Sequence, residues 1–216
     1  MEIHPPHAIR SVKDFLLQLL TITVGILIAL TLDGLLGWIH DHRLVHEAEA
    51  NLTTEVRENQ AALSKGMQGL RTSEQQLTGM LALVHQLQQN RATPLKNATF
   101  SWTLTELHGT SWSTAGATGA IAHMEYAEVK RYTRVYDLQQ QFMTIQNGAF
   151  DSAMSVNGLG TLLQKDMKKV SDSELSQAER VIGVALARTG AVENVGTALN
   201  GEYTSLSLPF PKSGKD

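Results

Sequence analysis

The sequence predicts an all-α protein, in which an N-terminal transmembrane helix continues into a long stalk helix that is followed by an antiparallel helical bundle. Three observations lead to this fold class. All five prolines lie outside 7–91 and 95–208, so these long stretches lack the strongest helix breaker. Val, Ile and Thr nowhere alternate with polar residues for long, which argues against strands. An uncharged apolar run near the N-terminus is followed by apolar residues at helical spacing.

The composition excludes several classes of protein. The 216 residues suffice for one ordinary domain with an appendage. The absence of cysteine excludes a disulfide framework, a thiolate zinc site and a cysteine nucleophile. A formal net charge of -3 argues against a general nucleic-acid binder, which needs a basic surface. We therefore expect no nucleic-acid partner.

The first predicted element is a transmembrane helix over 14–39. Phe15 to Leu32 is a run of eighteen residues without a charge. At ~1.5 Å per residue this run covers roughly 27 Å, close to the ~30 Å hydrocarbon core of a bilayer. Trp38 lies where an interfacial aromatic residue is expected. Asp33 is close enough to the helix end to reach the headgroup zone; a deeper position would require a partner or a wet cavity.

Two other interpretations compete with a membrane span. A cleaved signal peptide would have a shorter apolar region and a small-x-small site after it. A buried helix of a soluble protein would be flanked by other apolar elements, whereas the flanks here are polar. The orientation of the predicted span follows from its flanking basic residues. Arg10 and Lys13 precede the span, in the short tail 1–13, and Arg43 follows it. This balance favours a cytoplasmic N-terminus, with the bulk of the chain outside a bacterial inner membrane, in the periplasm.

The second predicted element is a stalk helix over 40–90, rich in helix-forming residues. Its seam has two lines of positions that recur every seven residues. One line is apolar, and the other is half polar or small. This mixed seam fits a dimeric zipper poorly. It fits better either one helix of a bundle or a helix that packs with partner chains of unequal shape. The expected interaction seam comprises Leu52, Val56, Leu63, Leu70, Leu77 and Val84; the second line continues through Asn59, Gly66, Ser73, Met80 and Leu87.

The region 91–208 is predicted to form the helical bundle. A turn over 90–94 precedes a short helix over 100–107, and Thr110 or Ser111 is expected to cap the next helix. That helix is predicted to close at Asn147-Gly148 and to form the core, through two stripes of side chains. The stripes are Tyr126, Val129, Thr133 and Tyr136, and Val135, Leu138, Phe142 and Ile145.

The final helix of the bundle has the clearest start signal. Ser171 precedes Glu174 by three residues, which is the pattern of a capping box. From Leu175 to Tyr203, apolar and small residues then recur at steps of three and four, which predicts close packing against other helices. The segment 209–216 is predicted to be a flexible tail.

One group of side chains has the spacing of a metal site. His42 and His46 are four residues apart on one helical face, and Glu49 follows one turn later, so the three are candidate ligands for zinc or another divalent ion. The alternative is that these residues are polar side chains suited to a membrane interface. No nucleophile elbow, phosphate-binding loop or dinucleotide fingerprint occurs in the sequence. We therefore expect no cofactor and no enzymatic activity.

Two stretches carry a resemblance to a known family. FLLQLLTITVGILIALTLD and the segment from Thr110 to Phe142, with Trp112, Tyr126 and Tyr136, resemble an uncharacterised family of bacterial single-pass inner-membrane proteins. Members have an N-terminal anchor and a helical extracytoplasmic domain. The anchor of the family often ends in an Asn-Trp pair, whereas this chain has Asp33-Gly34. The resemblance implies topology and a bacterial origin, and it implies no activity.

The function predicted from these features is that of a membrane-anchored helical scaffold or accessory subunit. Its expected partners are the lipid bilayer and either further copies of itself or a larger inner-membrane protein complex, for transport, respiration or photosynthesis. The alternative is a single-pass extracytoplasmic sensor or a protein that binds a small ligand or a metal. With about thirteen residues ahead of the span, a sensor would need another protein for its output.

Overall fold

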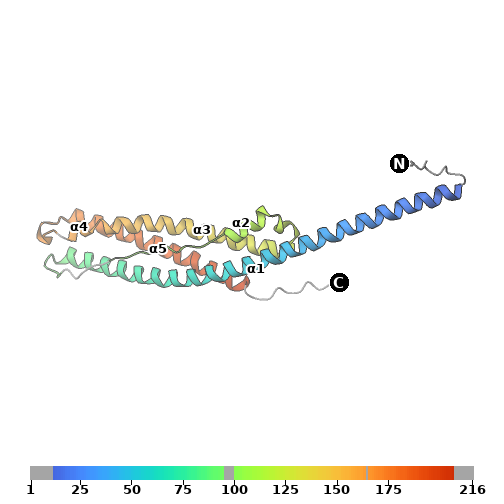
Figure 1. The fold of residues 1–216 in the computed structure, drawn as a ribbon. Coiled ribbons are helices and arrows are strands. Elements are labelled where there is room, and N and C mark those ends of the chain that lie inside the picture. The colour runs from blue at the N-terminus through green and yellow to red at the C-terminus, as the bar shows by residue number, and fades with distance from the viewer. Residues whose placement is uncertain (1–11, 95–99, 164, 207–216) are drawn as a thin grey trace, which may run out of the picture. The chain divides into compact units, whose positions relative to one another are not determined.

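The computed structural model describes residues 12–94, 100–163 and 165–206 (Figure 1). Within these ranges every regular element is helical, which confirms the prediction of an all-α protein. The predicted tail 209–216 and most of the predicted tail 1–13 lie outside the described residues. The elements are α1 (Val12–Gln89), α2 (Thr110–Ala117), η1 (Ala120–His123), α3 (Tyr126–Asn157), α4 (Gly160–Leu163), η2 (Met167–Lys169) and α5 (Asp172–Leu206).

The chain divides into two compact units, Met1–Glu47 and Ala48–Asp216. The described part of the first unit is the N-terminal portion of α1. The second unit is a bundle built from the remainder of α1 together with α3 and α5. The structure therefore differs from a stalk followed by a separate bundle, because most of the predicted stalk, from Ala48 onwards, is itself a bundle helix. Its seam residues Leu52, Leu63 and Leu77 are fully buried there.

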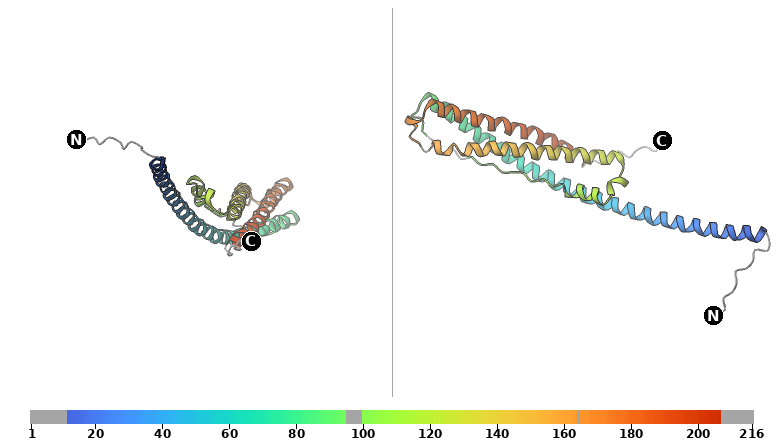
Figure 2. Two further views of the ribbon diagram at one scale, coloured as in Figure 1. Left: turned by 90° about the vertical axis from the view of Figure 1, so that its right-hand side faces the viewer. Right: turned by 90° about the horizontal axis from the view of Figure 1, so that it is seen from above.

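Within the second unit, α5 runs antiparallel to α1 and α3, and α1 and α3 run in the same direction (Figures 1 and 2). At one end Arg91, just after α1, pairs with Asp172 at the start of α5. Towards the other end Gln60 of α1 donates a hydrogen bond to Thr204 of α5 at 3.1 Å. In this bundle α3 and α5 are antiparallel, whereas α1, which was predicted as a stalk outside the bundle, runs parallel to α3. The two parallel helices are possible because 100–109, called here the strap, leads the chain back along the bundle.

An apolar core lies where α1 ends and α5 begins. Leu77 and Leu87 of α1 are fully buried against Leu175 and Ile182 of α5, and Val156 of α3 completes the layer. These side chains follow the three- and four-residue steps that keep one face of each helix apolar. All positions of α5 that were predicted to pack against other helices, from Leu175 to Tyr203, are buried.

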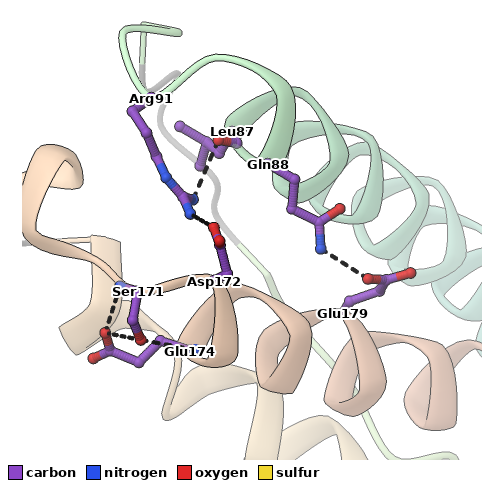
Figure 3. A network of polar contacts seen from close by, with 7 residues as sticks. All are labelled: Leu87, Gln88, Arg91, Ser171, Asp172, Glu174 and Glu179. Atoms are coloured by element: carbon purple, nitrogen blue, oxygen red, sulfur yellow. Dashed lines mark hydrogen bonds and ion pairs between the residues drawn. The ribbon is translucent and has the colours of Figure 1, made fainter.

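Polar contacts fix the start of α5 at this end of the bundle (Figure 3). The backbone N–H of Ser171 donates to the Glu174 carboxylate at 2.8 Å, and the N–H of Glu174 donates to Ser171 Oγ at 3.2 Å. This reciprocal pair confirms the predicted capping box. Lys165 and Ser171 together lower the pKa of Glu174 to about 2. Next along α5, Gln88 of α1 donates to the carboxylate of Glu179 at 2.9 Å.

Four local predictions were wrong. The predicted short helix over 100–107 is extended, because side chains of α1 and α3 bind its backbone. The predicted stop at Asn147-Gly148 does not occur, and α3 continues to Asn157. Upstream, the predicted continuous helix is interrupted by Gly119, whose φ of 82° is a conformation that favours glycine. Tyr126 was predicted to be in the core but is 81% exposed, since it begins α3 at the end of the bundle.

Candidate functional site

The N-terminal portion of α1 is one candidate functional surface. Every large apolar side chain from Phe15 to Ile39 is exposed, including Leu32 at 55% and Trp38 at 61%. This is the one helix among the described residues that is long and apolar enough to cross a membrane, with a mean hydropathy of 2.4 in its best window. The hydroxyls of Thr21, Thr23 and Thr31 donate to helix carbonyls three or four residues earlier, at 2.8–3.0 Å. The three threonine hydroxyls of this segment are thereby satisfied within the helix.

The predicted interaction seam is used inside the chain. Leu52, Val56, Leu63, Leu70, Leu77 and Val84 are all buried in the second unit. A seam that already packs on α3 and α5 is closed to a partner helix. The seam residues therefore form the core of the bundle, and a protein partner would have to bind a different surface.

The polar second line of the seam faces the strap. Asn59 contacts His108, Gly66 lies against Thr105, and Ser73 contacts Ser101. Two positions seven apart on a helix are ~10 Å apart along the axis, a distance that three or four extended residues also cover. The strap therefore runs antiparallel to α1 in matching register. Small and polar residues on this line make room for the strap and bind it.

Amide side chains bind both the N–H group and the C=O group of individual strap residues. Asn59 Oδ1 accepts from His108 N–H at 2.8 Å, and Asn59 Nδ2 donates to the His108 carbonyl at 2.6 Å. Gln146 of α3 holds Thr105 in the same way, at 2.8 Å and 2.9 Å. Extended backbone must find partners for its N–H and C=O groups when it is buried, and here it finds side chains where a sheet would supply other strands. We call these two residues the amide clamps.

A buried carboxylate organises the region beside the strap. Glu55 of α1 is 7% exposed and accepts hydrogen bonds from Tyr136 Oη at 2.7 Å and from the backbone N–H of Ser111 at 2.9 Å. Burial and the adjacent carboxylate raise the pKa of Tyr136 well above its usual value. Trp112 of α2 stacks on Tyr136 with ring centroids 5.5 Å apart. Glu55 thus caps α2, a role that the sequence assigned to Thr110 or Ser111.

A pair of carboxylates lies about two turns further towards the start of α3. The half-buried Glu128 forms a side-chain hydrogen bond with Glu49 of α1. Burial, together with repulsion from Glu49 and Glu125, raises the pKa of Glu128 to about 7, against a smaller opposing effect of Arg131. Two carboxylates in contact cannot both ionise without repulsion, so Glu128 keeps its proton to a higher pH than an isolated glutamate does.

The predicted metal ligands are not brought together as a site. His42 and His46 are exposed, and the ring of His42 stacks on Trp38 with centroids 5.2 Å apart. Glu49 contacts Glu128 as described above. Among the described residues, no group of three His, Asp or Glu side chains is placed to hold a metal ion.

Several hollows occur in the described part of the second unit. An apolar cavity of about 20 Å³ among Met80, Leu87, Met167 and Ile182 has room for about one water molecule, so it is a packing gap. A groove of about 700 Å³ lies between α3 and α5, and it is open to solvent. Tyr126, at the start of α3, is among the residues that line this groove.

Sequence reasoning missed the strap and the groove. The signal for the strap was present as the run Asn59, Gly66 and Ser73 on one line of an otherwise apolar seam. Comparison of the chain with models of known families, with curated proteins and with solved structures found no match.

Proposed function

We propose that this chain is a membrane-anchored, non-enzymatic helical scaffold or accessory subunit, which packs on itself or on a larger inner-membrane protein complex. The observation that carries the proposal is the contrast between the two units. The second unit has a core of its own, whereas the apolar segment of the first unit has no buried residue in its best membrane-spanning window.

The exposed apolar segment must be covered in its working environment. Removing one Leu, Ile or Phe side chain from water gains roughly 1.5–3 kcal/mol, so a continuous run of them strongly favours transfer to lipid. A run of this length in an α-helix matches the thickness of a bilayer. Asp33 and Trp38 then lie near the headgroups on one side. The bundle is the part of the chain available to protein partners.

The proposed location is the bacterial inner membrane, with a cytoplasmic N-terminus and the bulk of the chain in the periplasm. Arg10 and Lys13 before the span, against Arg43 after it, support this orientation. The resemblance of the anchor to that of bacterial single-pass proteins supports the choice of membrane. Protease treatment of spheroplasts tests the orientation, because the bundle is then digested only if it is periplasmic.

Membrane fractionation tests the anchor. We expect the full chain to resist carbonate extraction, and the variant Val24→Lys/Ile28→Lys to be released, because each charge at the centre of a span costs about 2.5–3.5 kcal/mol. The matched control Val24→Leu/Ile28→Leu should stay in the membrane. Recovery of the intact wild-type chain in a soluble fraction would overturn the proposal. Chemical crosslinking in native membranes then tests for association, and a lone monomer would contradict the scaffold role.

A second candidate function, an extracytoplasmic sensor, is favoured by one observation. The pair Glu49 and Glu128 lies where α1 enters the bundle, and the pKa of Glu128 is raised to about 7. Protonation near neutral pH therefore changes the contact between α1 and α3. Hydrogen exchange measured at pH 6 and pH 8 tests this function, and equal exchange in the first turns of α3 would exclude it.

A further inference from the structure

The chain contains three Asn-Gly pairs, at 147–148, 157–158 and 200–201. An asparagine that is followed by glycine is especially prone to spontaneous deamidation, because glycine has no side chain to obstruct an attack by its own backbone nitrogen. All three asparagine side chains are exposed to solvent. Their relative reactivity therefore depends on how firmly the surrounding backbone is held, and the structure holds the three pairs differently.

Two of the pairs lie inside helices. Asn147 is within α3, and the carbonyl of Gly148 accepts a hydrogen bond from Arg188 of α5 at 2.8 Å. Asn200 is within α5, in the turn before the fully buried Tyr203. In a helix interior each N–H bonds the carbonyl four residues earlier, and the helical backbone keeps that nitrogen turned away from the preceding side chain. These two pairs are therefore protected.

The third pair lies where α3 ends. Asn157 is the last residue of α3, and Gly158 follows it. The core contact of α3 ends at Val156, which is 1% exposed, whereas Asn157 and Gly158 are both exposed. The N–H of Gly158 donates to the Met154 carbonyl at 3.4 Å, longer than the usual ~2.7–3.2 Å. Helix ends open more readily than helix interiors, so this backbone can leave the helical conformation while the core stays packed.

We propose that Asn157 is the site of a spontaneous covalent modification, the conversion of its side-chain amide to aspartate and isoaspartate. The backbone nitrogen of Gly158 attacks Cγ of Asn157 and forms a new C–N bond. The bond from Cγ to the side-chain nitrogen breaks, and that nitrogen leaves as ammonia with the proton that the Gly158 nitrogen loses. Water then opens the five-membered imide at either of its carbonyls. Water is the only co-reactant.

The modification weakens the end of α3. A carboxylate on the last residue of a helix meets the negative end of the helix dipole, which disfavours it. Isoaspartate also adds one carbon to the main chain between Val156 and Leu159, and both of these side chains pack in the apolar core where α1 ends. The reaction thus changes both the charge and the backbone length where α3 leads into α4.

Peptide mapping of the full chain by tandem mass spectrometry tests the assignment. One detergent-solubilised sample is incubated at pH 8, and a second is unfolded in urea at the same pH. In the folded chain we expect Asn157 to deamidate at least about tenfold faster than Asn147 or Asn200, since helix ends open at lower free energy. In urea the three sites should react at similar rates. Fragment ions must separate Asn147 from Asn157, because no Lys or Arg lies between them.

Two variants complete the test. Asn157→Gln should lose the fast reaction, because cyclisation through the longer side chain gives a six-membered ring that forms much more slowly. Asn147→Gln is the matched control in the same helix and should leave the fast reaction unchanged. Equal rates at the three sites of the folded chain, or a slower reaction at Asn157 than at either other site, would overturn the proposal. A preference for Asn157 that persists in urea would also overturn it, since the fold would then not be its cause.

Discussion

Replacing Gly66 with alanine perturbs the closest approach between the strap and α1. A Cβ atom at this position would lie 1.8 Å from Thr105 Oγ1 and 2.9 Å from Thr105 Cβ. Thr105 is buried and β-branched, and both of its backbone groups are bound by Gln146, so it has little freedom to move away. The strap must therefore shift, or the amide clamp must break.

The expected size of the effect follows from two opposing terms. Alanine in a helix interior is more favourable than glycine by about 1 kcal/mol. Overpacking a buried site typically costs about 1–3 kcal/mol, and loss of the hydrogen bonds from Gln146 adds to that cost. We expect Gly66→Ala to lower the free energy of unfolding by roughly 1–2 kcal/mol. The matched control is Gly69→Ala on the same helix, which meets nothing within 4 Å and should stabilise the protein.

Urea unfolding of the full chain in detergent, followed by circular dichroism, measures both variants. Gly66→Ala/Thr105→Ala should recover part of the loss, because alanine at 105 removes the nearest atom and coupled residues give non-additive effects. If Gly66→Ala and Gly69→Ala raise stability equally, the strap does not lie against α1 as described, and the reasoning fails.

Three further predictions address other contacts. Because the pKa of Glu128 is raised from 4.5 to about 7, the stability that its bound proton contributes is full below pH 4.5 and is lost as pH rises through 7. Glu128→Gln should make the free energy of unfolding less dependent on pH and raise it by about 1 kcal/mol at pH 8, a value reduced for solvent screening. Thermal unfolding at several pH values measures this, and a pH dependence equal to that of wild type would contradict it. Gln146→Leu leaves the N–H and C=O groups of Thr105 unbound and should lower the free energy of unfolding by about 2–3 kcal/mol. Hydrogen exchange of the Thr105 amide should become faster, and exchange as slow as in wild type would refute the clamp. Ser171→Ala removes the cap of α5 and should cost about 1 kcal/mol, whereas Ser173→Ala should be neutral.

The sequence allowed prediction of those features that depend on local pattern. The capping box at Ser171, the end of α1 before Pro94 and the packing face of α5 follow from side chains only a few residues apart. The apolar segment around Phe15 to Leu32 is also visible as composition. Helix periodicity shows that a face is buried, but it does not show which segment covers that face.

The features that escaped prediction depend on contacts between distant residues. Phe100 to Leu107 has a composition compatible with a helix, and it is extended only because Ser73 and Gln146, far away in the sequence, bind its backbone. Similarly, Glu55 caps α2 from a position 56 residues upstream of Ser111. No local signal distinguishes a polar residue that will bind a distant backbone from one that will face water.

Recognition by the amide clamps is indifferent to the identity of the residue that is held. Asn59 and Gln146 contact only main-chain atoms of His108 and Thr105, and the side chains of Ser101, Thr103, Leu104, Glu106 and His108 point to solvent or are largely accessible. In relatives of this chain, substitutions should accumulate freely at these outward positions, while Asn59, Gly66 and Gln146 stay fixed. Conservation related to the strap is thus expected at the helix residues that bind it, and not in the strap itself.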